Sequence, residues 1–126
     1  IMDLKELERL ERADYFLLFE VLEHVPASEQ FLKIVYEKAE QGVFFSFPNS
    51  GFLSYRLRLL FGKFPAQWRV HPAEHLRFWT AADVKWWLKA LGISRYRIMY
   101  YRGVPALNRV WPSLFAAGIV VYLPKK

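Results

Sequence analysis

Residues 13–51, ADYFLLFEVLEHVPASEQFLKIVYEKAEQGVFFSFPNSG, contain the pattern of a strand, a helix and a second strand. Residues 15–21 form an apolar run interrupted by one glutamate, which is typical of a strand buried on both faces of a parallel sheet. We expect Ser28 to be the N-cap of a helix that Gly42 ends. GVFFSF (42–47) then forms the second strand. Two strands joined by a helix over so few residues predict a right-handed βαβ unit.

Residues 80–92 carry the strongest helix signal in the chain. Thr80 and Asp83 match a T-x-x-D variant of the capping box. The apolar positions that follow recur at helical spacing, and they are Val84, Trp87, Leu88 and Leu91. Gly92 is expected to end this helix. The helical phase places Trp87 on the buried stripe and its neighbour Trp86 outside it.

The other segments continue the alternation of helices and strands. A short amphipathic helix is expected at 3–11, an arginine-rich helix over 52–62 and an irregular loop over 63–79. Further strands are expected near 95–102 and 114–123. Alternating elements predict an α/β sheet, and a length of 126 residues is typical of a single domain.

Charge is distributed unevenly along the chain. Residues 1–50 hold five Lys or Arg against ten Asp or Glu, whereas residues 51–126 hold thirteen against two. The basic part indicates either a solvated face or an anionic partner such as phosphate, nucleic acid or a membrane surface.

Composition narrows the setting of the protein. The absence of cysteine excludes disulfides and thiolate metal ligands, and it is compatible with a reducing compartment. The longest apolar run, 113–123, is shorter than the roughly 20 residues that a membrane-spanning helix needs. The charged N-terminal segment does not match a secretory signal, so we expect a cytoplasmic protein without a membrane span.

FEVLEHVP (19–26) places two carboxylates and an imidazole where the first strand ends. If the chain turns helical after Phe19, then Glu20, Glu23 and His24 share one helical face. These ligands suit Mg²⁺ or Mn²⁺, and ligands of open α/β sheets bind beyond the carboxyl ends of the strands. In the alternative interpretation, the glutamate caps the next helix and the histidine packs on it.

Three segments, in their order and spacing, resemble the C-terminal half of class I S-adenosylmethionine-dependent methyltransferases. They are ADYFLLFEVLEHVP, SFPNSGFLSYRLRLLFGKFP and HLRFWTAADVKWWLKALG. The resemblance implies a partial Rossmann-like sheet made of the fourth to seventh strands, with the last strand antiparallel, in a single partial domain over 1–126. The sequence P-N, R-x-x-L-L, G-K-F-P also resembles the methionine-biosynthesis (MetW-like) branch.

One feature of that family is missing from the sequence. The family's glycine-rich cofactor loop, with an acidic residue after it, precedes the fourth strand, but no G-x-G pattern occurs here. We therefore expect the chain to be a fragment, and we expect it to bind S-adenosylmethionine poorly by itself.

The resemblance also implies roles for individual residues. The cofactor S-adenosylmethionine would lie against Phe19, Glu20 and Val21, although Phe19 could simply be the last core residue of its strand. In ubiquinone O-methyltransferases and small-RNA 2′-O-methyltransferases, E-x-x-E-H holds a divalent metal, which implies Glu20, Glu23 and His24 as ligands of Mg²⁺ or Mn²⁺. His75 matches a further functional histidine of the RNA enzymes.

The sequence indicates less clearly which residues would bind the methyl acceptor. Asn49 and Arg56 are candidate substrate residues, although Pro-Asn also marks a simple turn. The basic residues that could meet an anionic acceptor, or form a solvated face, are Arg56, Arg58, Lys63, Arg69 and Arg77. The function expected first is O-methylation of a small molecule. Alternatives are a non-catalytic MetW-like partner protein, with a protein partner or a homodimer, and metal-dependent 2′-O-methylation of RNA.

Overall fold

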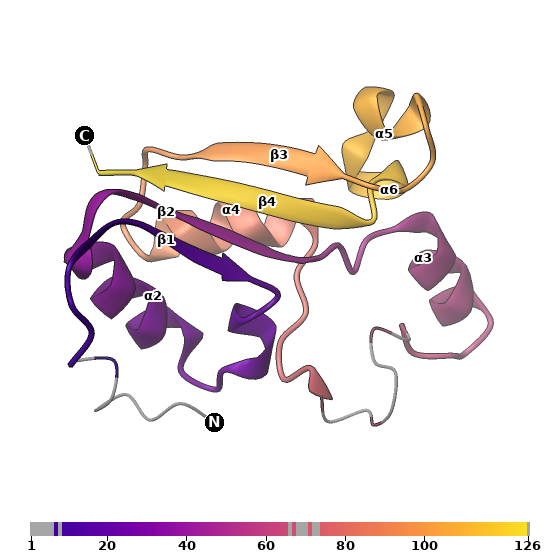
Figure 1. Ribbon diagram of the computed structural model, residues 1–126. Helices are drawn as coiled ribbons and strands as arrows, with labels where there is room; N and C mark the ends of the chain where they lie inside the picture. The colour runs from indigo at the N-terminus through magenta and orange to yellow at the C-terminus, as the bar shows by residue number, and fades with distance from the viewer. Residues whose placement is uncertain (1–6, 8, 66, 68–70, 72–73, 126) are drawn as a thin grey trace.

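The computed structural model, which describes residues 7, 9–65, 67, 71 and 74–125, contains a four-stranded sheet with the order β1-β2-β4-β3 (Figure 1). The strands are β1 (Ala13–Phe19), β2 (Ala39–Pro48), β3 (Arg97–Tyr101) and β4 (Gly118–Pro124). β1 runs parallel to β2, whereas β4 is antiparallel to both β2 and β3. The predicted α/β class, the partial Rossmann-like sheet and the antiparallel last strand are therefore confirmed.

Two helices cover the same face of this sheet (Figure 1). α2 (Ser28–Lys38) and α4 (Ala81–Ala90) place their apolar stripes against alternate residues of the central strands. The fully buried residues of this core include Phe31, Val35, Val43, Phe45, Phe47, Val84, Leu88, Ile119, Val121 and Leu123. Leu7 is also buried in it, while most of the helix predicted at 3–11 lies outside the described residues.

The opposite face of β1 is open, which corrects the prediction of a strand buried on both sides. Tyr15, Leu17 and Phe19 are each at least half exposed. β1 pairs only with β2 in the described part of the chain, and α2 and α4 both lie on the other face. An apolar run indicates that a strand is hydrophobic, but it does not indicate whether helices pack on one face of the sheet or on both.

The first helix begins and ends differently from the prediction. Ser28 is the first helical residue rather than the N-cap, and its Oγ donates to the carbonyls of Leu22 and Val25 at 2.8 and 2.7 Å. The helix ends at Lys38, so Gly42 lies inside β2. A Cβ at Gly42 would stand 2.5 Å from the Leu123 carbonyl oxygen of β4. This glycine therefore permits close strand contact instead of ending a helix.

The helix α4 follows its prediction. Thr80 and Asp83 form a complete capping box, and Gly92 follows the helix with φ of 75°. Trp87 is 5% exposed, whereas Trp86 is 71% exposed. The indole of Trp87 lies 6.1 Å from the ring of Phe45 and 5.3 Å from that of Trp79, so this helix is fixed to β2 by aromatic contacts.

The remaining helices lie toward the end of the sheet at which β1 and β2 finish (Figure 1). α3 (Leu53–Leu60) occupies most of the predicted 52–62 segment, and η1 (Leu22–His24) is a single 3₁₀ turn. The predicted strand at 114–123 begins only at Gly118, because the preceding residues form α5 (Leu107–Val110) and α6 (Pro112–Phe115). Proline at the first position of α6 favours this helix start. No described helix is long and apolar enough to span a membrane.

Candidate metal and cofactor site

The carboxyl end of β1 brings the acidic residues to the site by a reversal of the backbone. Glu20 follows β1 with φ of 54°, and η1 begins two residues later. Glu20 is therefore outside the helical turn that contains Glu23 and His24, which corrects the expectation of a shared helical face. The reversal aims the Glu20 side chain at the strands and leaves the other two residues to face the loop between α3 and α4.

The Glu20 carboxylate is held by two hydroxyl groups. Its Oε1 accepts hydrogen bonds from the Ser46 Oγ at 2.8 Å and from the Tyr101 hydroxyl at 2.9 Å. Burial, together with the hydrogen bond and charge of Glu20, raises the pKa of Tyr101 to about 12, so this phenol stays protonated and remains a donor. The Tyr101 ring lies across Gly118, where a Cβ would come within 2.2 Å of the ring.

An open cavity of about 490 Å³ adjoins this carboxylate on the sheet face opposite α2 and α4. Its lining residues are Phe19, Glu20, Ser46, Tyr101, Arg102 and Val120. Of the residues predicted to meet the cofactor, Phe19 and Glu20 line this cavity, whereas Val21 packs against the core. Ser46 and Tyr101 were not predicted, because only the sheet register brings them beside Glu20.

Glu23 is fully buried, and neither of its carboxylate oxygens has a hydrogen-bond partner among the described residues. Burial raises the pKa of Glu23 from 4.5 to about 8. Backbone hydrogen bonding opposes this rise, whereas the charge of the Glu20 carboxylate and its contact with Glu23 add to it. The backbone of Glu23 is well satisfied, since its carbonyl accepts from the N–H groups of Leu76 and Arg77 at 2.8 and 3.3 Å. Those two bonds fasten the loop that carries His75 to η1.

Two histidines stand beside this carboxylate. The Nδ1 of His24 donates to the carbonyl of Glu74, which leaves its Nε2 as the available ligand atom. The His24 and His75 rings meet edge to face, with centroids 4.8 Å apart. The Nδ1 of His75 is buried without a described partner, and burial followed by the charge of His24 lowers the pKa of His75. The neutral imidazole that this favours is the metal-binding form.

Glu23, His24 and His75 together form a candidate cation site. One ligand atom from each lies within 4.8 Å of those of the other two. Unpaired buried acceptors are costly without a partner, and a divalent ion supplies one. One carboxylate and two imidazoles suit Mn²⁺ better than Mg²⁺, which prefers oxygen ligands. Residues from two separate segments therefore fit a metal.

Asn49 lies at the end of β2 and is buried. Its amide nitrogen donates to the carbonyls of Ser113 and Ala116 at 3.2 and 2.7 Å, and its Oδ1 accepts from the N–H of Gly51 at 3.0 Å. Both amide hydrogens are thus committed to the protein. The neighbouring Arg56 donates to the carbonyl of Gly51 at 2.6 Å. These two predicted substrate residues join the β2 turn to α6.

We expect Asn49→Ala to lower the free energy of unfolding by about 2–3 kcal/mol, because it leaves buried backbone groups of Gly51 and Ala116 without partners. Urea unfolding measures the change. Asn108→Ala is the matched control, since that amide makes an exposed bond to the Arg102 carbonyl and should lose less than about 0.5 kcal/mol. Equal losses at both positions would contradict the structural role of Asn49.

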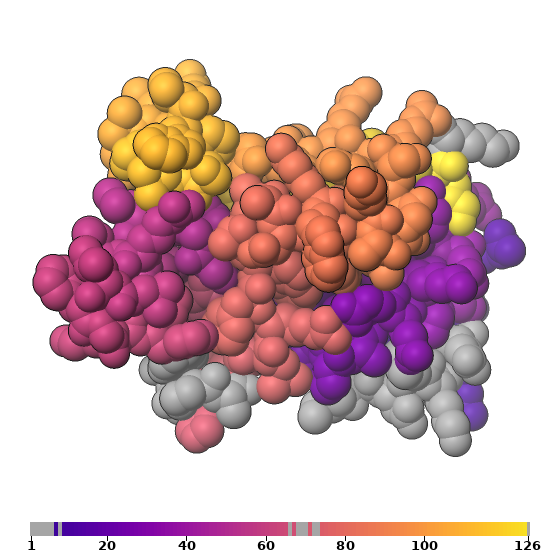
Figure 2. Space-filling view, turned by 180° about the vertical axis from the view of Figure 1, so that it is seen from behind, coloured from indigo at the N-terminus to yellow at the C-terminus, as the bar shows by residue number. Residues whose placement is uncertain are grey.

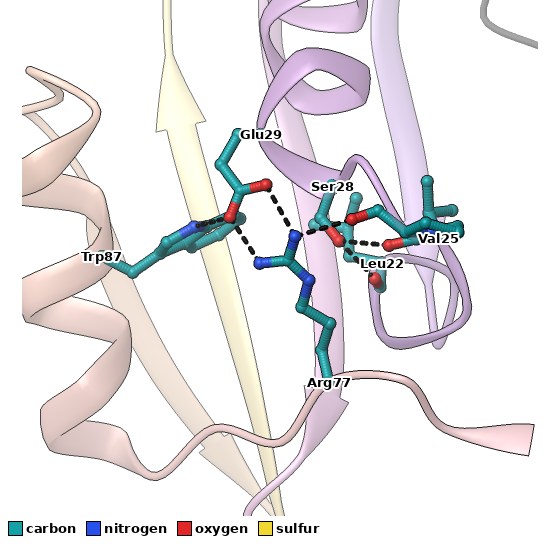
Figure 3. A network of polar contacts seen from close by, with 7 residues as sticks. Leu22, Val25, Ser28, Glu29, Arg77 and Trp87 are labelled. Carbon is teal, nitrogen blue, oxygen red and sulfur yellow. Dashed lines mark hydrogen bonds and ion pairs between the residues drawn. The ribbon is translucent and has the colours of Figure 1, made fainter. Parts of the chain in front are cut away.

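Arg77 is occupied by an ion pair, which argues against its role in binding an anionic acceptor (Figure 3). Its guanidinium donates to both carboxylate oxygens of Glu29 at 2.6 and 3.0 Å and to the Pro26 carbonyl. Trp87 also donates to Glu29 at 2.9 Å. Burial raises the pKa of Glu29, but these bonds outweigh it and lower the pKa overall. The network ties the His75 loop to α2 and α4.

The other predicted cations are not part of this cluster in the described part of the chain. Arg58 is exposed, and its Nε donates to the Phe64 carbonyl. Lys63 is exposed, and Arg69 lies outside the described residues. The sequence gives no signal for the Glu29–Arg77–Trp87 network, because its members are separated by 48 and 58 positions.

Comparison with known proteins adds three findings. The model of a family described as a methyltransferase domain matches residues 3–94. The structure is similar to that of the small RNA methyltransferase HEN1, with 22% identity and a TM-score of 0.60 over 95% of this chain and 15% of the other. It is also similar to a SAM-dependent methyltransferase from Archaeoglobus fulgidus, with 15% identity and a TM-score of 0.61 over 98% of this chain.

The chain spans 64% of the length of the archaeal protein. No curated protein matches the sequence.

Proposed function

Because the chain belongs to the methyltransferase domain family, we propose that it forms the metal-binding and acceptor side of an S-adenosylmethionine-dependent O-methyltransferase that acts on a small molecule. The solved proteins of similar fold are longer than this chain. We therefore propose that it is the C-terminal half of a methyltransferase domain and that the complete enzyme supplies the remaining cofactor contacts.

The cofactor would lie at the carboxyl end of β1, where open α/β sheets bind their ligands. The cavity beside Glu20 supports this position. It is lined by the half-exposed ring of Phe19 and by the Glu20 carboxylate, which Ser46 and Tyr101 hold in place. When bound, the cofactor supplies a methyl group on a positively charged sulfur. The Glu20 carboxylate offers a fixed negative charge at this edge.

One observation carries the metal-dependent part of the proposal: the buried oxygens of Glu23 have no described partner and lie beside two histidines. A capping role does not explain Glu23, since α2 begins after Ala27 and no side chain caps it. A divalent ion bound here would lower the pKa of an acceptor hydroxyl. Glu23, His24 and His75 would hold the ion, and Glu20 would add negative charge nearby.

Titration calorimetry with Mn²⁺ tests this site without any methyl acceptor. We expect the wild type to bind Mn²⁺ and His75→Ala to bind it with an affinity that is lower by roughly 100-fold or more. Removing even a group that only supports a metal ligand lowers metal affinity by about 10- to 100-fold. His71→Ala is the matched control, since His71 is exposed and outside the cluster. No binding by the wild type at millimolar Mn²⁺ would contradict the proposal.

The pH dependence of the same titration gives a second readout. Glu23 must lose its proton to bind the ion, and its pKa is raised to about 8. Affinity should therefore rise by about tenfold per pH unit between pH 6 and 8 and then level off. A flat profile over this range would show that Glu23 is not a ligand.

RNA 2′-O-methylation is the second candidate, supported by the same cluster and by the basic charge of residues 51–126. Transfer of labelled methyl groups by the complete enzyme to RNA or to small phenols separates the two acceptors. In a non-catalytic MetW-like partner, by contrast, Glu23→Gln would leave capture of the protein partner unchanged and no methyl transfer would be measured with any acceptor.

A further inference from the structure

The helix α3, all of whose residues are described, projects from the end of the sheet and buries none of its side chains (Figure 1). Leu57, Leu60 and Phe61 are spaced i, i+3 and i+4, so they form one stripe. Leu60 and Phe61 are 76% and 75% exposed, and Phe64 after the helix is 54% exposed. Large exposed apolar residues that are contiguous mark a site of interaction.

The flanks of this stripe are basic. At about 100° per residue, Arg56 and Arg58 lie on opposite sides of the line through Leu57. Lys63 follows after the helix, and residues 51–65 contain no Asp or Glu. The stripe is therefore apolar along its centre and cationic along both edges, which is the arrangement of helices that lie in a bilayer interface.

A second segment with the same chemistry lies beside it. Leu107, Val110 and Trp111 are exposed in α5 and the turn after it, and Val110 is 82% exposed. Arg102 and Arg109 are also exposed, and residues 102–115 contain no acidic residue. A guanidinium nitrogen of Arg56 donates to the Ser113 carbonyl of α6 at 3.4 Å, so the two segments are neighbours at one end of the molecule (Figure 2).

We propose that residues 53–64 and 102–111 form a docking surface for a lipid bilayer that contains anionic headgroups. The apolar side chains would insert between the headgroups, and Arg58, Lys63 and Arg109 would meet lipid phosphates. Trp111 has the amphipathic indole that favours the membrane interface. A second copy of the chain is a poorer partner, since both surfaces would be cationic and would repel each other.

Cosedimentation of the purified protein with sucrose-loaded vesicles tests the proposal. Vesicles of phosphatidylcholine with 30% phosphatidylglycerol are compared with vesicles of phosphatidylcholine alone. We expect at least tenfold stronger binding to the anionic vesicles, because each Lys or Arg near an anionic surface strengthens binding by about fivefold. Binding should weaken when salt rises from 0.1 to 0.5 M, and Trp fluorescence should shift to the blue.

Two sets of variants separate the apolar and the charged contributions. Leu60→Asp with Phe61→Asp should weaken binding roughly 100-fold, since two large apolar side chains no longer insert. Arg58→Gln with Arg109→Gln should weaken it roughly 25-fold and remove most of the preference for anionic lipid. Leu17→Asp is the matched control: Leu17 is 61% exposed on the open face of β1, outside the docking surface.

All the substituted side chains are exposed, so circular dichroism should report an unchanged fold. The proposal is overturned if the wild type does not bind anionic vesicles, or if Leu17→Asp weakens binding as much as the α3 variant. Concentration-dependent self-association that the α3 variant abolishes, without vesicle binding, would assign this surface to a second copy instead. Stable capture of a protein partner without vesicle binding would also overturn the proposal that this surface binds a bilayer.

Discussion

Glu23→Gln should reduce methyl transfer by the complete enzyme roughly 100-fold or more and yet make the metal-free protein more stable at alkaline pH. The loss of activity follows from removing a charged ligand of the cluster while keeping the size of the side chain. The gain in stability follows from burial: the wild-type carboxylate must ionise in a fully buried site without a described hydrogen-bond partner, whereas glutamine stays neutral.

The sign of the pH effect follows from the two pKa values of Glu23. Its pKa is about 8 in the folded protein and 4.5 when unperturbed. The unfolded chain therefore loses its proton first, and the free energy of unfolding of the wild type falls as pH rises from about 5 to about 8. We expect Glu23→Gln to exceed the wild type by about 1–3 kcal/mol at pH 8.5. Near pH 5 the difference should disappear.

Urea unfolding in the presence of a chelator, at pH 5 and at pH 8.5, measures the predicted difference in stability. Added Mn²⁺ should stabilise the wild type and not the variant, because only the wild type keeps all three ligands of the proposed metal site. A wild-type enzyme that is fully active after chelation would exclude the metal. A variant that is less stable than the wild type at both pH values would show instead that Glu23 has a stabilising partner.

Trp87→Ala should lower the free energy of unfolding by about 3–5 kcal/mol, the range for large core residues. Trp87 is 5% exposed, contacts the rings of Phe45 and Trp79, and donates to Glu29. The substitution therefore opens a cavity between α4 and β2 and also removes one bond of the network that holds the His75 loop.

Trp86→Ala is the internal control, since Trp86 is 71% exposed and should change stability by less than about 0.5 kcal/mol. Trp87→Phe keeps most of the packing and loses the bond to Glu29, so it should cost about 1 kcal/mol. Comparable losses in the two alanine variants would contradict the packing of α4.

Local patterns predicted the elements well where one signal dominated. The capping box and the apolar spacing after Thr80 identify α4 because both depend only on neighbours in the sequence. Gly42 shows the opposite case: glycine favours a helix end, but here its missing side chain serves contact with β4, more than 75 residues away. The glycine by itself does not indicate whether it ends a helix or allows two strands to come close together.

The candidate site was predicted in part. Glu20, Glu23, His24 and His75 were identified from a short motif and a family resemblance, and the structure brings three of them together. The hydroxyl partners of Glu20 were missed, because Tyr101 is 81 positions away and reaches Glu20 only through the order of the strands. Sheet order is set by the packing of the whole chain and not by any local pattern.

The strand order also has a consequence for how the molecule assembles during synthesis. In the sequence β4 follows the other three strands of the described sheet, yet it lies between β2 and β3. While a ribosome is still making residues 118–124, β2 can already pair with β1. β3, however, has no neighbouring strand in the described sheet without β4. Tyr101 is therefore not yet held where its hydroxyl can bond to Glu20. The hydroxyl pair around Glu20 is therefore completed only as the last strand enters the sheet, after the rest of the site has been translated.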